Sequence, residues 1–481
     1  MSLRKQAISG VIWTILDSFF LRALSFIATI ILARWLGPDD FGLLGMITIF
    51  IAIGTSITDS GLSSSLIRTK NADEEDFSTV FLLNLLFSGI VYLIIFLGAP
   101  YIADFFNQPI LKNIVRVYCT SFIISGFSAV QLARLNSTMQ FKKITQYNIP
   151  GIVISTILGL LLGYFEYGVW ALVWMYLSNQ LIKTMILWIS SGWKPKIKFS
   201  KEKAKYHYSF GYRLMLSGLL NTFFQYIYNI VIGKFYTVKD LGFYERSRSL
   251  NDYPVQTLTT VVSKVTYPLL VNVKEDKEKI SNIYKKILGL TFFITAPLMF
   301  GASAVALPLF RLILGDQWLG AVPYFQILCL AGMFYPIHAF NLNVYQVFGR
   351  SDLFLKIEII KKIIIVLGIL VGMQFGIMGL VWSSVITNYI ALYVNTYYSK
   401  DMINYKAYDQ FKDLIPTFIL GTLMFLLIKF SLFYLINYSL LVQILLAMII
   451  GVGFYVISNL IFKNKTLKYI IHLSKEKFKF T

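Results

Sequence analysis

Charged side chains are scarce in this sequence: they make up 14% of its 481 residues, against about 25% in soluble domains. Hydrophobic residues account for 57%. A soluble protein cannot hide that much apolar surface, so lipid must be the solvent for most of this chain. Apolar runs recur from residue 11 to residue 462, which leaves no separate soluble domain. The first run follows Arg4 and Lys5 and lacks a cleavage site, so we expect an uncleaved first span.

Residues that build metal and redox sites are also few. The two cysteines, Cys119 and Cys329, lie in apolar runs and are expected to be small core residues rather than a disulfide. The three histidines, His207, His338 and His472, have no metal-ligand spacing with one another, and there is no Walker A motif. We therefore expect no metal, no cofactor, no catalytic residue and no direct use of ATP.

Apolar runs of membrane-spanning length are abundant. A membrane helix needs about 20 apolar residues, and clusters of turn or charged residues separate the candidates. The sequence predicts an all-α polytopic membrane protein with about fourteen transmembrane helices. Two of the divisions rest on tight turns, at Glu166-Tyr167-Gly168 and at Phe375-Gly376. The predicted spans are residues 11–35, 41–64, 79–103, 113–137, 148–166, 168–190, 209–234, 241–270, 286–309, 321–346, 357–374, 376–398, 414–433 and 439–462.

Positive charge is distributed unequally between the two sides of these spans. Thirty Lys and Arg residues lie in or beside the N-terminus, the loops after even-numbered spans and the C-terminal tail, and six lie on the other side. Cytoplasmic loops carry such an excess, so we expect both termini in the cytoplasm. The net charge of +20 is then mostly a topology signal and requires no nucleic-acid partner. The basic segment Trp193–His207 is expected to contact anionic membrane lipids.

Four short motifs occur twice, at offsets of 200 to 208 residues. The pairs are Ser9-Gly10 with Phe210-Gly211, Arg34-x5-Asp40-Phe41-Gly42 with Lys234-x5-Asp240-Leu241-Gly242, Leu135-Asn136 with Leu342-Asn343, and the run 167–174 with the run 375–382. Spans 1–6 and 7–12 are therefore expected to be two copies of one unit, inserted the same way round, with the substrate path at their interface. This favours a transporter that works by alternating access, although a pseudo-symmetric channel is an alternative.

The repeat sets the predicted domains. Residues 1–192 form an N-terminal six-helix lobe, residues 193–208 a basic cytoplasmic linker, and residues 209–400 a C-terminal six-helix lobe. Residues 401–481 add two transmembrane helices and a basic cytoplasmic tail.

Eight basic residues remain once those 36 are counted, and they lie inside the predicted spans, where a charge costs several kcal/mol unless it faces a wet cavity or a partner. They are Arg22, Arg116, Arg134, Lys183, Arg213, Arg246, Arg248 and Lys264. For Arg116, Lys183 and Arg213, which lie near span ends, snorkelling to the interface is the simpler interpretation. Bases outnumber acids within the spans, which favours an anionic substrate, because a guanidinium pairs with phosphate in a forked geometry.

Arg22 lies about eleven residues from either end of span 1 and belongs to a polar stripe at helical spacing. Asp17 borders that stripe. A buried pair between Asp17 and Arg22 is the alternative, but five residues on a helix separate them by about 140°. Asp17 is also the candidate to carry a coupling proton or sodium ion.

Spans 7 and 8 supply the other polar candidates. Asn221 and Gln225 stand four residues apart in span 7, where amide hydrogen bonds between helices are the alternative to substrate binding. Arg246, Arg248 and Asp252 precede Pro254 in span 8 and predict a kinked, solvated vestibule. The candidate substrate-binding residues are Arg22, Asp17, Asn221, Gln225, Arg246, Arg248, Asp252, Lys264 and Arg134.

Several blocks carry a resemblance to a known family. They are Arg34-Trp-Leu-Gly-Pro-Asp-Asp-Phe-Gly42, the segment 59–67 beginning Asp59-Ser-Gly-Leu, the segment 241–246, Tyr253-Pro254-Val255, Tyr267-Pro268-Leu269-Leu270 and Gly315-Asp-Gln-Trp318. These blocks resemble Wzx-type oligosaccharide flippases of the multidrug/oligosaccharidyl-lipid/polysaccharide exporter superfamily, in the branch named for colanic-acid export. The similarity covers roughly residues 1–400 and is weaker over spans 13 and 14.

The resemblance implies a multi-pass protein of the bacterial cytoplasmic (inner) membrane. It would flip undecaprenyl-pyrophosphate-linked oligosaccharide repeat units outward for capsule, O-antigen or exopolysaccharide synthesis, next to a polymerase or ligase. By position, Arg22, Arg246 and Arg248 would engage the pyrophosphate or acidic sugars.

Three alternatives remain. A drug exporter of the same superfamily would need acidic cavity residues to hold cations, and the basic bias counts against it. An exporter of lipid-linked peptidoglycan precursors differs only in its headgroup. A membrane polymerase, ligase or glycosyltransferase acting on the same lipid carrier would need a large external loop, whereas the longest external connection here is about ten residues.

Overall fold

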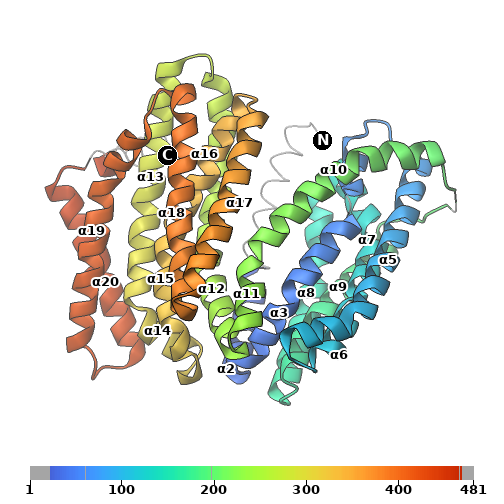
Figure 1. The fold of residues 1–481 in the computed structure, drawn as a ribbon, viewed down its shortest axis with the longest axis horizontal. Helices are drawn as coiled ribbons and strands as arrows, with labels where there is room; N and C mark the ends of the chain where they lie inside the picture. Colours follow the sequence, from blue (N-terminus) through green and yellow to red (C-terminus); the bar gives the residue numbers. More distant parts are fainter. Residues whose placement is uncertain (1–21, 60, 197, 465, 469–481) are drawn as a thin grey trace. The chain divides into compact units, whose positions relative to one another are not determined.

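The computed structural model describes residues 22–59, 61–196, 198–464 and 466–468 (Figure 1). Nearly all of these residues are helical, and none of them forms a strand. The prediction of an all-α polytopic protein is confirmed.

The chain divides into two compact units, residues 1–242 and residues 243–481, and the boundary falls inside helix α12. Unit 1 contains α2 (Arg22–Trp35), α3 (Pro38–Asp59), α4 (Leu62–Arg68), α5 (Glu74–Phe106), α6 (Leu111–Tyr118), α7 (Thr120–Ser137), α8 (Phe141–Tyr164), α9 (Val169–Ser190), α10 (Lys201–Gln225), α11 (Ile227–Phe235) and the start of α12 (Val238–Val273). Unit 2 contains the rest of α12, α13 (Lys277–Ala304), α14 (Ala306–Ile313), the 3-10 helix η2 (Asp316–Ala321), α15 (Val322–Gly332), α16 (Tyr335–Val347), α17 (Ser351–Met373), α18 (Gly376–Ile403), α19 (Ala407–Tyr434) and α20 (Leu440–Ile461).

Within each unit the long helices form a bundle. In unit 1, α8 packs along α9, α5 packs against α7 and α3, and α10 packs against α3 and α4. In unit 2, α17 packs along α18, and α13 packs against α15 and α19, which in turn contacts α20 (Figure 1). Helix α10, which opens the second predicted repeat, therefore packs inside unit 1.

Nine stretches of the described chain are long and apolar enough to cross a membrane, or ten if the bent pair α10 and α11 is one span. Several predicted spans, including those in α12 and α17, fall outside this set because they are too polar or carry too many charges. Helix α17, for example, contains Glu358, Lys361 and Lys362. The count of fourteen remains a prediction.

The helix faces have the polarity expected of a protein surrounded by lipid. Helix α20 buries Gln443, Ala447, Gly451 and Tyr455, which recur every four residues. Its exposed face carries Leu441, Leu445, Met448, Ile449 and Val452. Small and polar residues face the protein interior while large apolar residues point outward, which is the arrangement of a membrane helix packed on one side.

Both predicted tight turns are confirmed. Helix α8 ends at Tyr164 and α9 begins at Val169, and Glu166 and Gly168 between them have φ values of 60° and 57°. Helix α17 ends at Met373, and Gly376, with a φ of 72°, begins α18. Glycine adopts a positive φ without steric cost, so both turns reverse the chain in few residues.

Other predicted spans are broken. Span 2 consists of α3 and α4, which together still form one span-length stretch, Pro38–Arg68. Between them Gly61 has a φ of 64°, and a methyl group there would lie 2.8 Å from the carbonyl oxygen of Gly211 on α10. Span 7 begins earlier than predicted, at Lys201, because the Ser200 side chain accepts a hydrogen bond from the Lys203 backbone N–H and caps the helix. It then bends by 43° between α10 and α11, at Tyr226. Helix α12, in contrast, continues through Pro254.

Two matched glycines of the predicted repeat meet in unit 1, where the start of α12 crosses α3. A methyl group at Gly42 would lie 2.0 Å from the carbonyl oxygen of Val238, and one at Gly242 would lie 1.9 Å from the carbonyl oxygen of Pro38. Only glycine permits this backbone-to-backbone approach. The two copies of the Asp-x-Gly motif thus form one helix crossing.

Candidate functional site

Two adjoining cavities open among the membrane helices of unit 1, with volumes of about 530 and 290 Å³. The larger lies between α3, α6, α9 and α10, and the smaller between α3, α4, α7 and α9. Thr55 and Asp59 line both of them, so we treat the pair as one site, the unit-1 cavity. The polar residues of the larger part are Thr48, Thr55, Ser56, Asp59, Thr222 and Gln225, together with three tyrosines.

The threonines of α3 present acceptors to this cavity. The hydroxyls of Thr48 and Thr55 each donate 2.7 Å hydrogen bonds to the carbonyl oxygens of Leu44 and Ile51 on the preceding turn. A hydroxyl has one donor and two lone pairs, so the lone pairs of both groups remain to accept a hydrogen bond. The wall can therefore receive hydroxyl donors from a polar ligand.

Aromatic side chains form another wall of the unit-1 cavity. Tyr118 and Tyr176 stack with their ring centroids 4.7 Å apart and an interplanar angle of 16°. Gln180, on α9, donates to the Tyr176 hydroxyl over 3.3 Å. Tyr226 lines the same cavity at the break between α10 and α11. Flat aromatic faces beside hydroxyl and amide groups suit a ligand with both apolar and polar faces, such as a sugar ring.

The unit-1 cavity also holds charge of both signs. Asp59 is the exposed last residue of α3, and Lys183 of α9 lines the smaller part. An ionisable residue deep in a membrane segment is a functional-site hypothesis by default. Lys183, for which snorkelling was the simpler interpretation, lines a cavity in this structure.

Unit 2 positions a second polar group, on α12. The Arg248 Nε atom lies 3.6 Å from Asp252 Oδ2, one helical turn away, and Asn251 donates to Asp252 Oδ1 over 3.5 Å. Arg246 is 3% exposed. The predicted clustering of these residues on one helix is present, but their role in binding remains a prediction.

The predicted site residues thus have different positions. Gln225 lines the unit-1 cavity, whereas Asn221, on the same helix, is exposed outside its lining. Arg134 lies in the last turn of α7, 6.0 Å from the ring centroid of Phe77. Asp17 lies outside the described residues, and the side chains of Arg22 and Lys264 are not among those described.

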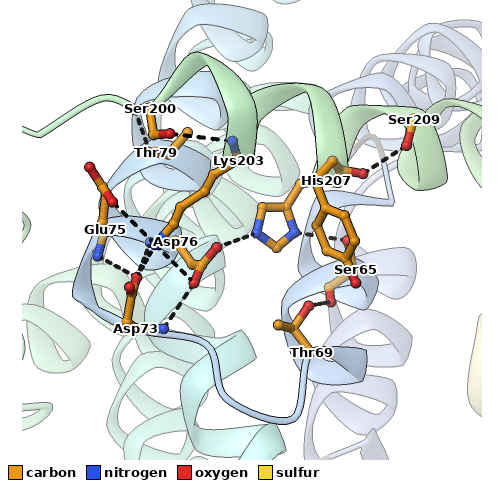
Figure 2. A network of polar contacts seen from close by, with 11 residues as sticks. Ser65, Thr69, Asp73, Glu75, Asp76, Thr79, Ser200, Lys203, His207 and Ser209 are labelled. Atoms are coloured by element: carbon orange, nitrogen blue, oxygen red, sulfur yellow. Dashed lines mark hydrogen bonds and ion pairs between the residues drawn. The ribbon is translucent and has the colours of Figure 1, made fainter.

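A polar network, buried at Ser65, Asp76 and His207, joins α4, α5 and α10 at one end of unit 1 (Figure 2). The His207 ring has Ser65 Oγ 2.8 Å from its Nδ1 and Asp76 Oδ1 3.1 Å from its Nε2. An ionised Asp76 can only accept, so Nε2 donates to it, and in the neutral ring Nδ1 accepts from the Ser65 hydroxyl. Lys203 Nζ lies 2.5 Å from Asp73 Oδ1, 3.2 Å from Glu75 Oε2 and 3.4 Å from Asp76 Oδ2. We call these six residues the α5 anchor.

The α5 anchor contains the residue types of a serine hydrolase triad but not its arrangement. In such a triad the serine contacts Nε2 and the aspartate contacts Nδ1, the reverse of the geometry here. His207 is 0% exposed and Ser65 is 2% exposed, so no substrate reaches the hydroxyl. The contacts instead hold α10 to α4 and α5.

The segment before α10 is fixed to the same end of α5. The Trp193 Nε1 atom donates to Glu74 Oε2 over 2.9 Å, and the backbone N–H groups of Lys196 and Ser200 donate to Ser78 Oγ and Thr79 Oγ1, both over 3.1 Å. The basic linker thus lies along the first turns of α5.

Asp73 combines two roles in this region. Its side chain accepts from the backbone N–H groups of Glu75 and Asp76 and caps α5 in a capping box. The Lys203 hydrogen bond and, after it, the hydrogen bond from the Asp76 backbone N–H lower the pKa of Asp73 below its usual value. The carboxylate therefore stays ionised across the physiological pH range.

Most of these residues carry no signal in the sequence that marks them as part of a site. Asp59 begins the segment 59–67, which carries part of the family resemblance, but no pattern in the sequence indicated that its carboxylate lines a cavity. In unit 2, Lys361 and Lys362 belong to the thirty basic residues placed in or beside the loops, but both lie on α17 with Nζ atoms close to Glu358, the Lys362 atom at 3.6 Å. Among the described residues, no group of three or more His, Cys, Asp or Glu side chains could hold a metal ion.

Comparison with known proteins identifies the family. Residues 31–323, more than half of the chain, match the family described as "Polysaccharide biosynthesis protein". The chain belongs to this family. The resemblance to polysaccharide exporters noted in the sequence is confirmed.

Individual relatives of this polysaccharide biosynthesis protein are distant but cover most of its length. The lipopolysaccharide biosynthesis protein WzxC of Escherichia coli (strain K12) is 22% identical over 378 residues, which span 78% of this chain and 77% of WzxC. The teichuronic acid biosynthesis protein TuaB of Bacillus subtilis (strain 168) is 23% identical, over 73% of each chain. The succinoglycan biosynthesis transport protein ExoT of Rhizobium meliloti (strain 1021) is 24% identical, over 70% of this chain and 68% of its own.

Solved structures show where the fold belongs. The lipid II flippase MurJ, in an inward closed conformation, has a TM-score of 0.75 at 17% identity, covering 94% of this chain and 99% of its own. An inward-facing multidrug resistance MATE family transporter of the MOP superfamily has a TM-score of 0.63 at 18% identity, covering 79% of this chain and 94% of its own. The polysaccharide biosynthesis protein thus has the fold of polytopic helical transporters.

Proposed function

We propose that this protein is a flippase that carries lipid-linked oligosaccharide units across a bacterial cytoplasmic membrane for polysaccharide assembly. It is a transporter rather than an enzyme: the chain belongs to a polysaccharide biosynthesis family, and ExoT is named as a transport protein. The observation that carries the proposal is the unit-1 cavity, a polar space walled by stacked tyrosines inside otherwise apolar helices.

The proposed substrate has two parts that need different surroundings. Sugar hydroxyls would donate to the threonines of α3, and sugar rings would lie against Tyr118 and Tyr176. The carrier is proposed to be undecaprenyl pyrophosphate, whose phosphates would pair with Arg22, Arg246 or Arg248. Alternating access would expose the cavity to one side of the membrane and then to the other.

The remaining parts of the proposal rest on the sequence. The distribution of positive charge supports cytoplasmic termini. Asp17 is proposed to bind a coupling proton or sodium ion, and Asn221, Asp252, Lys264 and Arg134 are proposed to contact the substrate. A polymerase or ligase would receive the translocated unit.

The test measures which leaflet holds the oligosaccharide lipid. A deletion strain is converted to protoplasts and treated with an impermeant sugar-specific probe. We expect the lipid to be inaccessible without the protein and accessible after complementation. A unit that already faces outward in the deletion strain would show that the protein acts after translocation, and accumulation of a peptidoglycan precursor instead would refute the substrate class.

A matched pair of variants connects this transport to the cavity. Thr55→Val removes a hydroxyl from the cavity wall and should lower the rate of outward appearance about fivefold, the effect of losing one hydrogen bond of about 1 kcal/mol. Thr422→Val is the control, because Thr422 on α19 makes the same type of hydrogen bond to the preceding turn, 3.0 Å to Phe418, and does not line the cavity. Equal rates for the two variants would show that the cavity does not lie on the transport path.

A further inference from the structure

Unit 2 has a groove of about 850 Å³ between α13, α19 and the segment that follows α20. Its lining begins beside Lys285 and Asp413 and continues along α19 to Leu420. Seven residues of helix correspond to about 10 Å, so the groove is about two helical turns deep. It lies wholly within unit 2 and shares no residue with the unit-1 cavity.

The two ends of this groove differ in chemistry. The inner end is apolar: Leu290, Leu414 and Leu420 contribute to its floor. At its edges Ile419 is 51% exposed and Phe462 is 72% exposed, which is the exposure of side chains that contact lipid. Gly289 leaves room in the wall, since the nearest atom to a methyl group there would be Thr466 Oγ1, at 3.5 Å.

The outer end is basic. Among the described residues that line the groove are three lysines, Lys285, Lys286 and Lys463, and one acidic residue, Asp413. Lys285 Nζ lies 2.9 Å from Asp413 Oδ2, and the same carboxylate accepts a short hydrogen bond from the Tyr405 hydroxyl. Three lysines and one carboxylate among the described lining residues give the mouth of the groove a net positive charge, which suits an anion.

The charged residues of the mouth come from three segments that end on the same side of the helices. Lys285 and Lys286 lie in the first third of α13, Lys463 follows the end of α20, and Asp413 is in the second turn of α19. In the orientation proposed above these positions are cytoplasmic. Anionic lipid headgroups in that leaflet attract basic pockets between transmembrane helices.

We propose that this groove binds one anionic glycerophospholipid of the surrounding leaflet, with its phosphate between Lys286 and Lys463 and an acyl chain along the leucine floor. A single phosphate matches the small basic mouth, and a fluid chain matches the apolar inner end. Beyond the mouth, the polar lining is limited to hydroxyls such as that of Thr417, which suits an oligosaccharide headgroup poorly. The bound lipid fills the space between α13 and α19 and is not the transported substrate.

The test compares two lipids with the same acyl chains. The purified full-length chain in detergent is titrated with dioleoylphosphatidylglycerol or dioleoylphosphatidylcholine, and bound lipid is counted by native mass spectrometry. The wild type should retain the anionic lipid preferentially. Each lysine near a membrane surface contributes about fivefold in affinity, so Lys286→Gln with Lys463→Gln should weaken the anionic lipid about 25-fold and leave phosphatidylcholine unchanged.

Two further variants keep this test decisive. Gly289→Leu fills the groove, retains every charge and adds helix propensity, and it should reduce binding of both lipids. Lys142→Gln with Lys143→Gln removes two exposed lysines of unit 1 and should bind like the wild type. A thermal unfolding midpoint for each variant verifies that the chain is folded.

Several results would overturn the proposal. Equal retention of the two lipids in the wild type would show that the charges do not select the ligand. Displacement by glycerol 3-phosphate alone would show that the apolar inner end is not used. Tighter binding of undecaprenyl phosphate than of phosphatidylglycerol would assign the groove to the carrier lipid instead.

Discussion

The helix crossing of α3 and α12 allows a sharp test, because one methyl group should disturb it. In Gly42→Ala the new methyl carbon would lie 2.0 Å from the Val238 carbonyl oxygen, whereas real Cβ contacts are essentially never under 3.0 Å. The helices must therefore separate by at least 1.0 Å. The obstructing atom belongs to the backbone of a helix, so it cannot rotate away as a side chain would.

The magnitude follows from two opposing effects. Overpacking costs about 1–3 kcal/mol, and a backbone obstacle places this case near the upper value. Alanine in a helix gains about 1 kcal/mol over glycine, which leaves a net loss of about 2 kcal/mol. Gly89 on α5 is the control, because a methyl group there meets nothing within 4 Å. Gly89→Ala should gain about 1 kcal/mol, so the two variants should differ by about 3 kcal/mol.

Thermal unfolding of the full-length protein in detergent measures this difference. Gly42→Ala should unfold below the wild type, and Gly89→Ala at or above it. Gly242→Ala should behave like Gly42→Ala, since its methyl carbon would lie 1.9 Å from the Pro38 carbonyl oxygen. The double variant should lose less than the sum, because the first substitution already separates the helices. If Gly42→Ala is as stable as Gly89→Ala, the close crossing does not exist.

Three other expectations concern the α5 anchor and the topology. His207→Ala should cost about 2–4 kcal/mol, because it leaves buried polar groups on Asp76 without their partner, while Tyr206→Ala at an exposed neighbouring position should cost much less in the same thermal assay. The pKa of Asp73 is lowered in the fold, so its stabilising contribution is complete above the usual carboxyl pKa of 3.8 and is lost as the pH falls toward the lower folded value. The difference in stability between the wild type and Asp73→Asn should therefore be constant from pH 7 to 5 and begin to narrow only near pH 4. If both termini are cytoplasmic, maleimide should label Tyr438→Cys in intact protoplasts and Lys406→Cys only after permeabilisation. The native Cys119 and Cys329 are buried and should give little background labelling. The opposite pattern would invert the proposed topology.

Local features of the fold were predictable because they depend on neighbouring residues. The turns at Glu166 to Gly168 and at Phe375-Gly376 follow from glycine between two apolar runs, and both are present. The break at Gly61 was not predicted, because the predicted span ran on to residue 64 and the close approach of the Gly211 backbone joins residues 150 positions apart. The bend at Tyr226 likewise has no Pro or Gly to mark it.

The candidate site was less predictable for the same reason. Helical periodicity in α10 identified Gln225, and the structure places it in the unit-1 cavity. The partners of that residue come from α3, α6 and α9, and no spacing within α10 specifies them. The contact of His207 with Asp76 joins residues 131 positions apart, and one sequence by itself gives no sign of such a pairing.

The α5 anchor has a consequence for how the chain is made. Every partner in it, from Ser65 to His207, belongs to the first 242 residues, as does the α3–α12 crossing. Once α10 has been synthesised and inserted, all the groups that form this network are therefore present. N-terminal regions fold first during synthesis, so unit 1 can complete its own packing while unit 2 is still being translated. The helix that opens the second predicted repeat is thus part of the packing of unit 1, and His207 and Asp76 can be buried before the second half of the chain is made.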